Sequence, residues 1–361
     1  MPAYPSADAA VRDSTEPRRG EFGADSENRI SLDGEWDFLH LVEDYRARPV
    51  EWRQIAVPGP WQAQFPDLRM RGGTGIYRRG FDIPAGWLRA RQFIRFGAVF
   101  HIARIWVNDS YLGMHIGGFL PFAFDATELL IQGRNEIRVQ VDSPVDDPNE
   151  FPDTPFAEIP FGKQSWYGPL SGIWQSVSLE RRVADHIARL RLAPEWETGE
   201  LAVHAYIAEA SVRDGWMRAA ILAPGGETVV STEKYVVRGS DTVALSLFVP
   251  DRLAWSPAAP HLYSVTITLE QEGHPVDQIV EHFGFRRIET RNGRFFLNGE
   301  PLLLRAALDQ DYYPDTICTT PSTEFLEDQF RRPGNLASTA CAATSRRRTR
   351  AITTWRIRWG C

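Results

Sequence analysis

The sequence of 361 residues predicts a mostly β protein that begins with two successive antiparallel sandwiches. Two observations predict this. From Phe96 to Val141, short alternating segments are separated by turn residues, as in strands that bury one face. From Arg182 to Phe283 the pattern recurs in shorter segments, without the cysteine pair of antibody domains. The second sandwich is therefore expected to be immunoglobulin-like only in outline.

In the first sandwich, apolar residues alternate with polar ones along the strands expected at Thr74–Ile83, Ala103–Val107, Tyr111–His115 and Glu136–Val141. Asn108-Asp109 supplies a tight turn, because short polar side chains tolerate positive φ. Gly117-Gly118 ends the returning strand. Asp125-Ala126-Thr127-Glu128 has the pattern of a short helical cap.

The second sandwich is expected to contain strands at Ile187–Leu192, Leu201–Ile207, Met217–Leu222, Thr242–Val249 and Tyr263–Leu269. A third unit follows. Asn298-Gly299 predicts a hairpin turn, and Leu302–Arg305 reads as the continuous apolar strand that a parallel barrel requires. An amphipathic helix begins at Ser322, and we expect Pro333-Gly334 to interrupt it.

Composition limits the classes of function. The net charge is −7, and no apolar run approaches the ~20 residues of a membrane span. The first 26 residues are polar and lack the apolar stretch of a signal peptide, so we expect a disordered leader and a cytoplasmic protein. The three cysteines all come late and have no metal-ligand spacing, so neither a metal nor a cofactor is expected.

The run ARIWVNDSYLGMHIGGFLPFAFDATELLIQGRNEIRVQV ends at Val141 and resembles the N-terminal jelly-roll domain of glycoside hydrolase family 2. This is the group of β-galactosidases, β-glucuronidases and β-mannosidases. Asp109 stands where that family usually has glycine. Three further stretches resemble the family in order: VPGPW before Gln62, GPLSGIWQ before Ser176, and FGFR followed by FFLNGEPLLLR before Ala306. The last matches the entry into the family's (β/α)₈ barrel.

The resemblance implies a jelly roll, an immunoglobulin-like sandwich and the incomplete start of a (β/α)₈ barrel. The expected divisions are a leader at 1–26, a sugar-binding jelly roll at 27–182, a sandwich at 183–283, the barrel start at 284–330 and an Arg-rich tail at 331–361. That tail holds eight arginines and no Asp, Glu or Lys.

Candidate sugar-binding residues occur in two places. The long Pro- and Gly-rich loop from Ser143 to Trp174 reaches toward the barrel mouth in family members, and it offers Lys163, Gln164, Trp166 and Tyr167. The equally weighted alternative is a loop that only packs at a domain interface. Asp309, Gln310 and Asp311 follow the first barrel strand, where barrel active sites are built, although loop capping explains them as well. For Trp61 and Tyr77 we favour core packing over ligand contact.

Retaining glycosidases need two carboxylates about 5–5.5 Å apart, and in this family both are glutamates on later barrel strands, one of them preceded by asparagine. The Asn-Glu pairs here are Asn135-Glu136 and Asn149-Glu150, neither in a barrel context. The chain is therefore expected to lack catalytic residues and to be an inactive part of a retaining β-glycosidase. The alternative is a non-catalytic carbohydrate-binding β-sandwich protein. The partner expected is a β-glycoside, with neither nucleic acid nor membrane, and the parent enzyme is expected to assemble as a homo-oligomer.

The tail departs from the family pattern. One base added to the coding sequence near Arg332 would shift the reading frame. The resulting amino-acid sequence would contain Gly-Phe-Asn-Cys-Leu-Arg, which is similar to the family's second barrel strand, so we suspect a frameshift. Nucleic-acid binding by this tail is disfavoured, because an accidental frame readily produces arginine runs. Without a second strand, Leu302–Leu304 would have no parallel neighbour and would leave an apolar edge open to aggregation.

Overall fold

The computed structural model describes residues 28–41, 51–146, 149, 151, 156–159, 169–208, 211–303, 306–309, 312–335 and 340–343. For 157, 306–309, 330–335 and 340–343 it describes only the backbone. The expected leader lies outside the described residues, as does the Arg-rich tail apart from 331–335 and 340–343.

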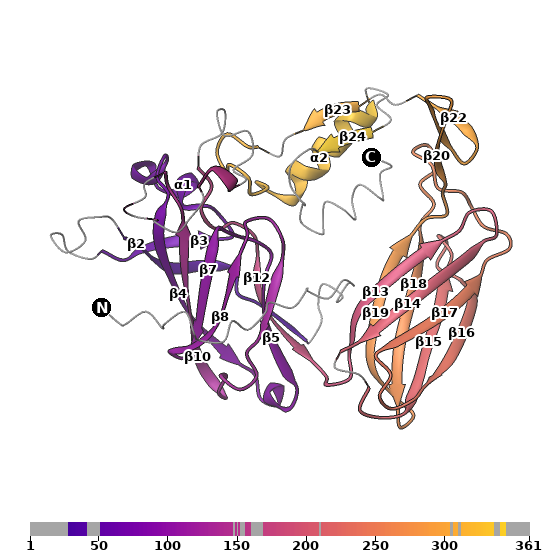
Figure 1. Cartoon of the computed structure of the whole chain (residues 1–361), viewed down its shortest axis with the longest axis horizontal. Helices are drawn as coiled ribbons and strands as arrows, with labels where there is room; N and C mark the ends of the chain where they lie inside the picture. Colours follow the sequence, from indigo (N-terminus) through magenta and orange to yellow (C-terminus); the bar gives the residue numbers. More distant parts are fainter. Residues whose placement is uncertain are drawn as a thin grey trace.

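The first sandwich packs a six-stranded sheet against a four-stranded one, both antiparallel (Figure 1). The six-stranded sheet runs β3 (Arg53–Val57), β2 (Gly34–Leu41), β4 (Gly73–Ile83), β10 (Gly133–Ser143), β7 (Ile102–Val107) and β8 (Ser110–Ile116). The other runs β1 (Arg29–Ser31), β12 (Val177–Arg182), β5 (Arg91–Phe96) and β9 (Phe122–Asp125). Short elements complete it: α1 (Trp61–Gln64), β6 (Val99–Phe100), β11 (Gly172–Ile173) and 3₁₀ turns at Pro66–Leu68, Trp87–Arg89 and Phe156–Glu158.

The predicted alternation holds in this sandwich. Along β7, Ala103, Ile105 and Val107 are buried while the residues between them are partly exposed. Asn108 and Asp109 both have positive φ, which confirms the tight turn into β8. Trp61 and Tyr77 are completely buried, so the core-packing interpretation of both is confirmed.

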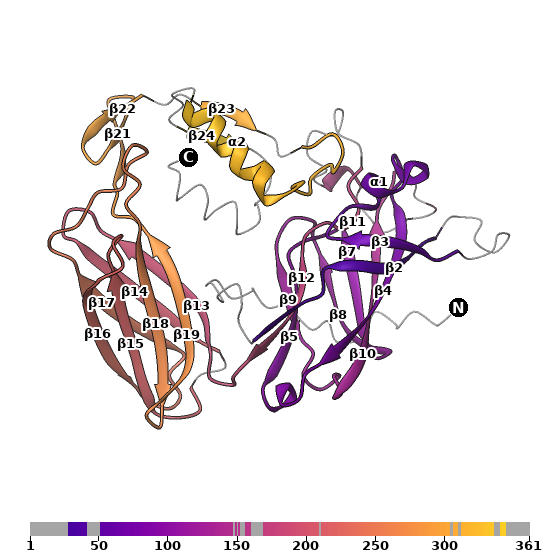
Figure 2. The same cartoon turned by 180° about the vertical axis from the view of Figure 1, so that it is seen from behind.

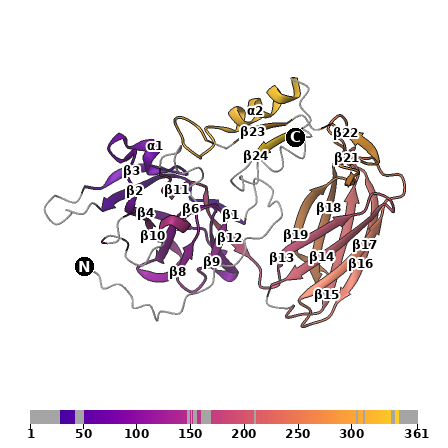
Figure 3. The same cartoon turned by 45° about the horizontal axis from the view of Figure 1, so that its top comes forward.

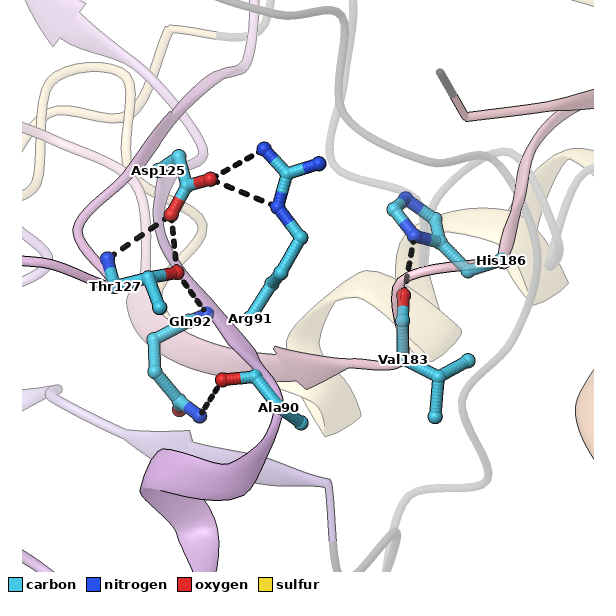
Figure 4. A network of polar contacts seen from close by, with 7 residues as sticks. All are labelled: Ala90, Arg91, Gln92, Asp125, Thr127, Val183 and His186. Carbon is cyan, nitrogen blue, oxygen red and sulfur yellow. Dashed lines mark hydrogen bonds and ion pairs between the residues drawn. The ribbon is translucent and has the colours of Figure 1, made fainter. Parts of the chain in front are cut away.

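The expected cap at Asp125 forms a turn rather than a helix (Figure 4). Its carboxylate accepts hydrogen bonds from the Thr127 backbone N–H at 2.9 Å and from the Arg91 Nε at 2.9 Å. Burial alone would raise the pKa of Asp125, but these bonds outweigh it and the pKa is lowered. The turn is thereby fastened to β5, where the Gln92 N–H also donates to Thr127 Oγ1.

The second sandwich packs β13 (Ile187–Pro194), β14 (Glu200–Ile207) and β17 (Thr242–Phe248) against a four-stranded sheet (Figure 2). That sheet runs β16 (Thr228–Val236), β15 (Gly215–Leu222), β18 (Tyr263–Gln271) and β19 (His274–Phe283). All five expected strands are present, and β16 and β19 are additional. Residues 183–186 link the two sandwiches, between β12 and β13. This linker packs against the first sandwich, since the Phe93 ring lies 4.5 Å from the Arg182 guanidinium and 5.9 Å from the His186 ring.

The third unit corrects three sequence predictions. It comprises β20 (Ile288–Arg291), β21 (Arg294–Leu297), β22 (Glu300–Leu302), β23 (Ala306–Asp309), α2 (Thr323–Asn335) and β24 (Ala340–Ala343). Leu302 belongs to the antiparallel hairpin, whose Asn298-Gly299 turn is confirmed, and the parallel strand begins later, at Ala306. That strand is not unpaired, because β24 lies parallel beside it. α2 continues through Pro333 to Asn335, so the expected interruption is wrong.

Candidate sugar-binding site

Most of the residues predicted to contact sugar lie outside the described part of the chain: Lys163, Gln164, Trp166, Tyr167, Gln310 and Asp311. Asp309 is the last residue of β23, where the structure describes its backbone. The described residues that flank the two predicted groups show where those groups are anchored.

The long loop leaves the first sandwich at Ser143 and returns at Ser171, and these two residues meet. The Ser171 hydroxyl donates to Ser143 Oγ at 2.6 Å, and the Gln62 side-chain amide donates to Ser171 Oγ at 2.7 Å. All three side chains are buried. The next residue, Gly172, has a φ of 96°, and a Cβ there would collide with the Tyr77 hydroxyl. Both ends of the loop are therefore fixed at one point of the sandwich.

Trp174 extends this anchor toward the third unit. It is 3% exposed, and its indole N–H donates to the Gly118 carbonyl at 2.8 Å. Its own carbonyl accepts a 2.8 Å hydrogen bond from the Thr319 hydroxyl, 145 residues further along the chain. The Trp174 backbone thus connects the first sandwich to the segment that follows β23.

That segment is a compact turn. Tyr313 and Ile317 exchange two backbone hydrogen bonds, of 2.7 and 2.9 Å. The Arg69 guanidinium donates to the Pro314 carbonyl at 2.8 Å, which holds the turn against the first sandwich beside α1. Figures 1 and 3 show α2 and β23 at the end of the first sandwich that carries α1.

One apolar cluster joins these parts, and we call it the joint cluster. Its buried members come from both sides of the junction: Ala98, Phe100, Ile159, Leu170, Trp174, Ile317 and Cys318. Tyr312 packs against it and directly follows Asp311. Tyr167 precedes Leu170 by three residues in the sequence. The chain positions next to both predicted groups therefore meet in a single cluster.

The residues that make this junction were mostly not found from sequence. Trp174 belongs to the GPLSGIWQ motif, but Arg69, Ile317 and Thr319 carry no sequence signal. Among the described residues there is no group of three or more His, Cys, Asp or Glu side chains that could hold a metal ion. Within the described chain, no helix is long and apolar enough to cross a membrane.

Two partly buried histidines lie in the first sandwich, His101 directly before β7 and His115 near the end of β8. The His101 ring lies 5.2 Å from Phe100, and the His115 ring stacks at 4.0 Å on Phe122. Burial lowers the pKa of both, and for His115, where the neighbouring His101 adds to the effect, the pKa falls to about 4.

We expect acid to destabilise this sandwich. Between pH 6.5 and about 4 the unfolded chain binds a proton at position 115 that the folded chain does not, so stability is complete above pH 6.5 and falls as the pH drops. After allowance for partial exposure, the loss from this one residue is about 1–2 kcal/mol. Urea unfolding at pH 7.5 and 5.0 measures it. His115→Gln should reduce the difference in unfolding free energy between pH 7.5 and pH 5.0 by that amount. An unchanged difference would contradict the assignment of this pH dependence to His115.

The sequence of this chain is similar to those of a known protein family. Residues 30–182 match the family model described as "Glycosyl hydrolases family 2, sugar binding domain", and residues 182–286 match the model "Glycosyl hydrolases family 2". A β-galactosidase of Aeromonas hydrophila is 30% identical over 329 residues, which cover 78% of this chain and 30% of that protein. One from Thermoanaerobacter pseudethanolicus is 28% identical and covers 66% of this chain and 32% of its own length.

Solved structures agree in fold. The β-glucuronidase of Bifidobacterium dentium, solved with coumarin-3-O-glucuronide, superposes with a TM-score of 0.79 at 22% identity, covering 95% of this chain and 62% of that one. A β-glucuronidase from Ruminococcus gnavus gives a TM-score of 0.77 at 18% identity, with coverages of 94% and 59%. The chain spans about a third of the length of the curated relatives it matches.

Proposed function

The chain belongs to glycoside hydrolase family 2, and from this premise we propose that it carries the substrate-facing N-terminal part of a retaining, exo-acting β-glycosidase. The curated relatives named above are β-galactosidases, which makes a terminal β-galactoside the first candidate substrate. A β-glucuronide is the second, because the fold superposes on β-glucuronidases.

The joint cluster is the observation that supports this proposal. It anchors the long loop of the first sandwich and the turn after β23 to the same place, so the side chains that project from both can act on one sugar. In this proposal Trp166 and Tyr167 stack on the apolar face of the pyranose ring. Gln164, Asp309, Gln310 and Asp311 exchange hydrogen bonds with its hydroxyl groups, the usual combination in a polar ligand site.

Hydrolysis needs two carboxylates on opposite faces of the bond that breaks. Asn135-Glu136 offers none at the joint cluster. The Asn135 side chain is buried and bonds to the Ile131 carbonyl at 2.8 Å, while Glu136 faces outward on β10 near Arg78. Of the second pair, Glu150 lies outside the described residues. We therefore propose that these 361 residues bind a glycoside without cleaving it.

Ligand-observed NMR with phenyl β-galactoside tests the binding half of the proposal. The chain should give saturation transfer to the galactose ring, and Trp166→Ala combined with Asp311→Ala should reduce it at least five-fold. Asp315→Ala, an exposed residue of the same turn, is the matched control and should leave it unchanged. Equal signals from all three proteins would reject this site. If residues 27–182 alone gave the full signal, a carbohydrate-binding sandwich would explain the chain better.

A further inference from the structure

Six side chains form a row across the outer face of the six-stranded sheet, one on each strand. They are register partners from strand to strand: Gln54, Asp37, Arg78, Arg138, Trp106 and Tyr111. Directly opposite residues of antiparallel strands share a face, and their neighbours along the strands, such as Phe38, Tyr77 and Ile105, are buried in the core. This row, which we call the outer band, therefore faces away from the core. Five inter-strand spacings give it a length of about 24 Å.

One half of the outer band is polar. The Gln54 amide donates to Asp37 Oδ1 at 2.7 Å, and Arg78 Nη2 donates to Asp37 Oδ2 at 3.0 Å. Glu136 lies two residues before Arg138 on the same face, and its carboxylate is 3.9 Å from Arg78 Nε. These four charged side chains carry two positive and two negative charges. The polar half thus offers hydrogen-bond donors and acceptors in balanced charge.

The other half is aromatic. Trp106 is partly exposed; its ring centre lies 4.8 Å from the Arg138 guanidinium and 5.5 Å from that of Tyr111. Trp52, just before β3, is 40% exposed, and its ring lies 4.6 Å from the Arg78 guanidinium. Cation–π contacts of this kind hold the tryptophans in place. A ligand would therefore meet side chains that are already ordered, so that binding costs little conformational entropy.

The outer band lies on a different face of the first sandwich from both neighbouring units. The linker packs against Phe93 on β5 of the four-stranded sheet, whereas the next residue, Ile94, points into the core. Figure 1 shows β5 and β12 on the side of the first sandwich that is nearer the second. The third unit is attached at the end that carries α1, through Arg69 and Trp174. The candidate sugar-binding site is at that end as well.

We propose that the outer band binds a neutral polysaccharide in an extended conformation, at a second site separate from the candidate sugar-binding site. Pyranose rings have apolar C–H faces that stack on aromatic rings, and their hydroxyl groups exchange hydrogen bonds with amides, carboxylates and guanidinium groups. The length of the band suits a polymer rather than a single sugar. This inference does not depend on the proposed function.

The charges of the band favour this ligand over two others. Nucleic acid is bound through an excess of cations, whereas Asp37 and Glu136 here balance Arg78 and Arg138. Charged residues are depleted from the centres of protein–protein interfaces, but they occupy the middle of the outer band. A neutral polymer uses the paired charges as hydrogen-bonding groups and leaves their balance unchanged.

Electrophoresis of the full chain in native gels that contain a soluble polysaccharide measures this binding. We expect lower mobility with at least one of three neutral polymers, β-1,4-galactan, galactomannan or hydroxyethylcellulose, than in a gel without polymer. Unchanged mobility in all three gels would overturn the proposal. Stronger retardation by polygalacturonate, an anionic polymer, than by any neutral one would also overturn it, because the chain would then recognise charge.

Two tryptophan variants locate the polymer. Trp106→Ala should weaken its binding at least five-fold, and Trp52→Ala at least three-fold. Trp216→Ala is the matched control and should bind as the unchanged chain does, because Trp216 makes the same edge-on contact with a tyrosine, Tyr235 at 5.3 Å, on the second sandwich. Equal polymer affinities of Trp106→Ala, Trp52→Ala and Trp216→Ala, all folded by circular dichroism, would reject the outer band.

A further comparison separates the two sites. The variant that combines Trp166→Ala with Asp311→Ala should still bind the polymer, and Trp106→Ala should still give saturation transfer to phenyl β-galactoside. Loss of polymer binding in the double variant would place the polymer in the candidate sugar-binding site and contradict this inference. The proposed function and the outer band can therefore fail independently of each other.

Discussion

Trp61→Ala is expected to lower the free energy of unfolding of the first sandwich by about 3–5 kcal/mol. Trp61 is completely buried, and its ring centroid lies 5.7 Å from that of Phe38 and 5.4 Å from that of His40. Its indole N–H donates to the Arg71 carbonyl at 2.9 Å. Alanine would leave a cavity and would remove one of the two hydrogen bonds that the Arg71 carbonyl accepts, the other coming from the Gln62 side-chain amide at 2.8 Å, so both effects act in the same direction.

Urea denaturation followed by tryptophan fluorescence and by far-ultraviolet circular dichroism measures the change. Trp52→Ala is the matched control, because Trp52 is 40% exposed and its ring lies 4.6 Å from the Arg78 guanidinium. It should cost no more than about 1 kcal/mol. Similar losses for the two variants would show that Trp61 is not the core residue that its burial indicates.

The fold of the two sandwiches was largely predictable because strand alternation is a local signal. Ala103–Val107 buries every second residue, and that period is visible without knowledge of the partner strand. The Asn298-Gly299 turn is equally local, since it depends on two residues with positive φ. Such features survive in any context and can be predicted from the sequence.

The missed strands lack this signal. β16 is exposed over most of its length, so its residues show little alternation, and it is defined by pairing with β15. The parallel strand was placed four residues too early, because Leu302–Leu304 is the more apolar stretch whereas β23 is the one paired with β24. In both cases a contact distant in sequence decided the structure, overriding local preference.

The candidate site was predictable to the same limited degree. The GPLSGIWQ motif, which contains Trp174, pointed to the loop, and the position after a barrel strand pointed to Asp309. The junction that places the two together depends on Arg69 with Pro314, 245 residues apart, and on Trp174 with Thr319. No sequence window spans such pairs. The candidate sugar contacts themselves remain predictions.

The second large effect concerns catalysis. We expect the 361-residue chain to hydrolyse no nitrophenyl β-glycoside above the uncatalysed rate, because the proposal places both catalytic glutamates outside it. A version with the frame restored near Arg332 and extended through a complete barrel should cleave nitrophenyl β-galactoside with a rate enhancement of at least about 10⁶-fold. In that longer chain, Asp311→Ala should lower kcat/KM about 10²-fold by removing a sugar contact, while Asp315→Ala should leave it unchanged.

The most direct test compares the two purified chains on a panel of nitrophenyl β-galactoside, β-glucuronide and β-mannoside, with product release recorded at equal protein concentration. Activity in the extended chain alone is the predicted result, with the galactoside cleaved fastest. Hydrolysis by the 361-residue chain would contradict the account, provided that the activity co-elutes with this chain throughout its purification. The catalytic carboxylates would then have to lie among the residues already present.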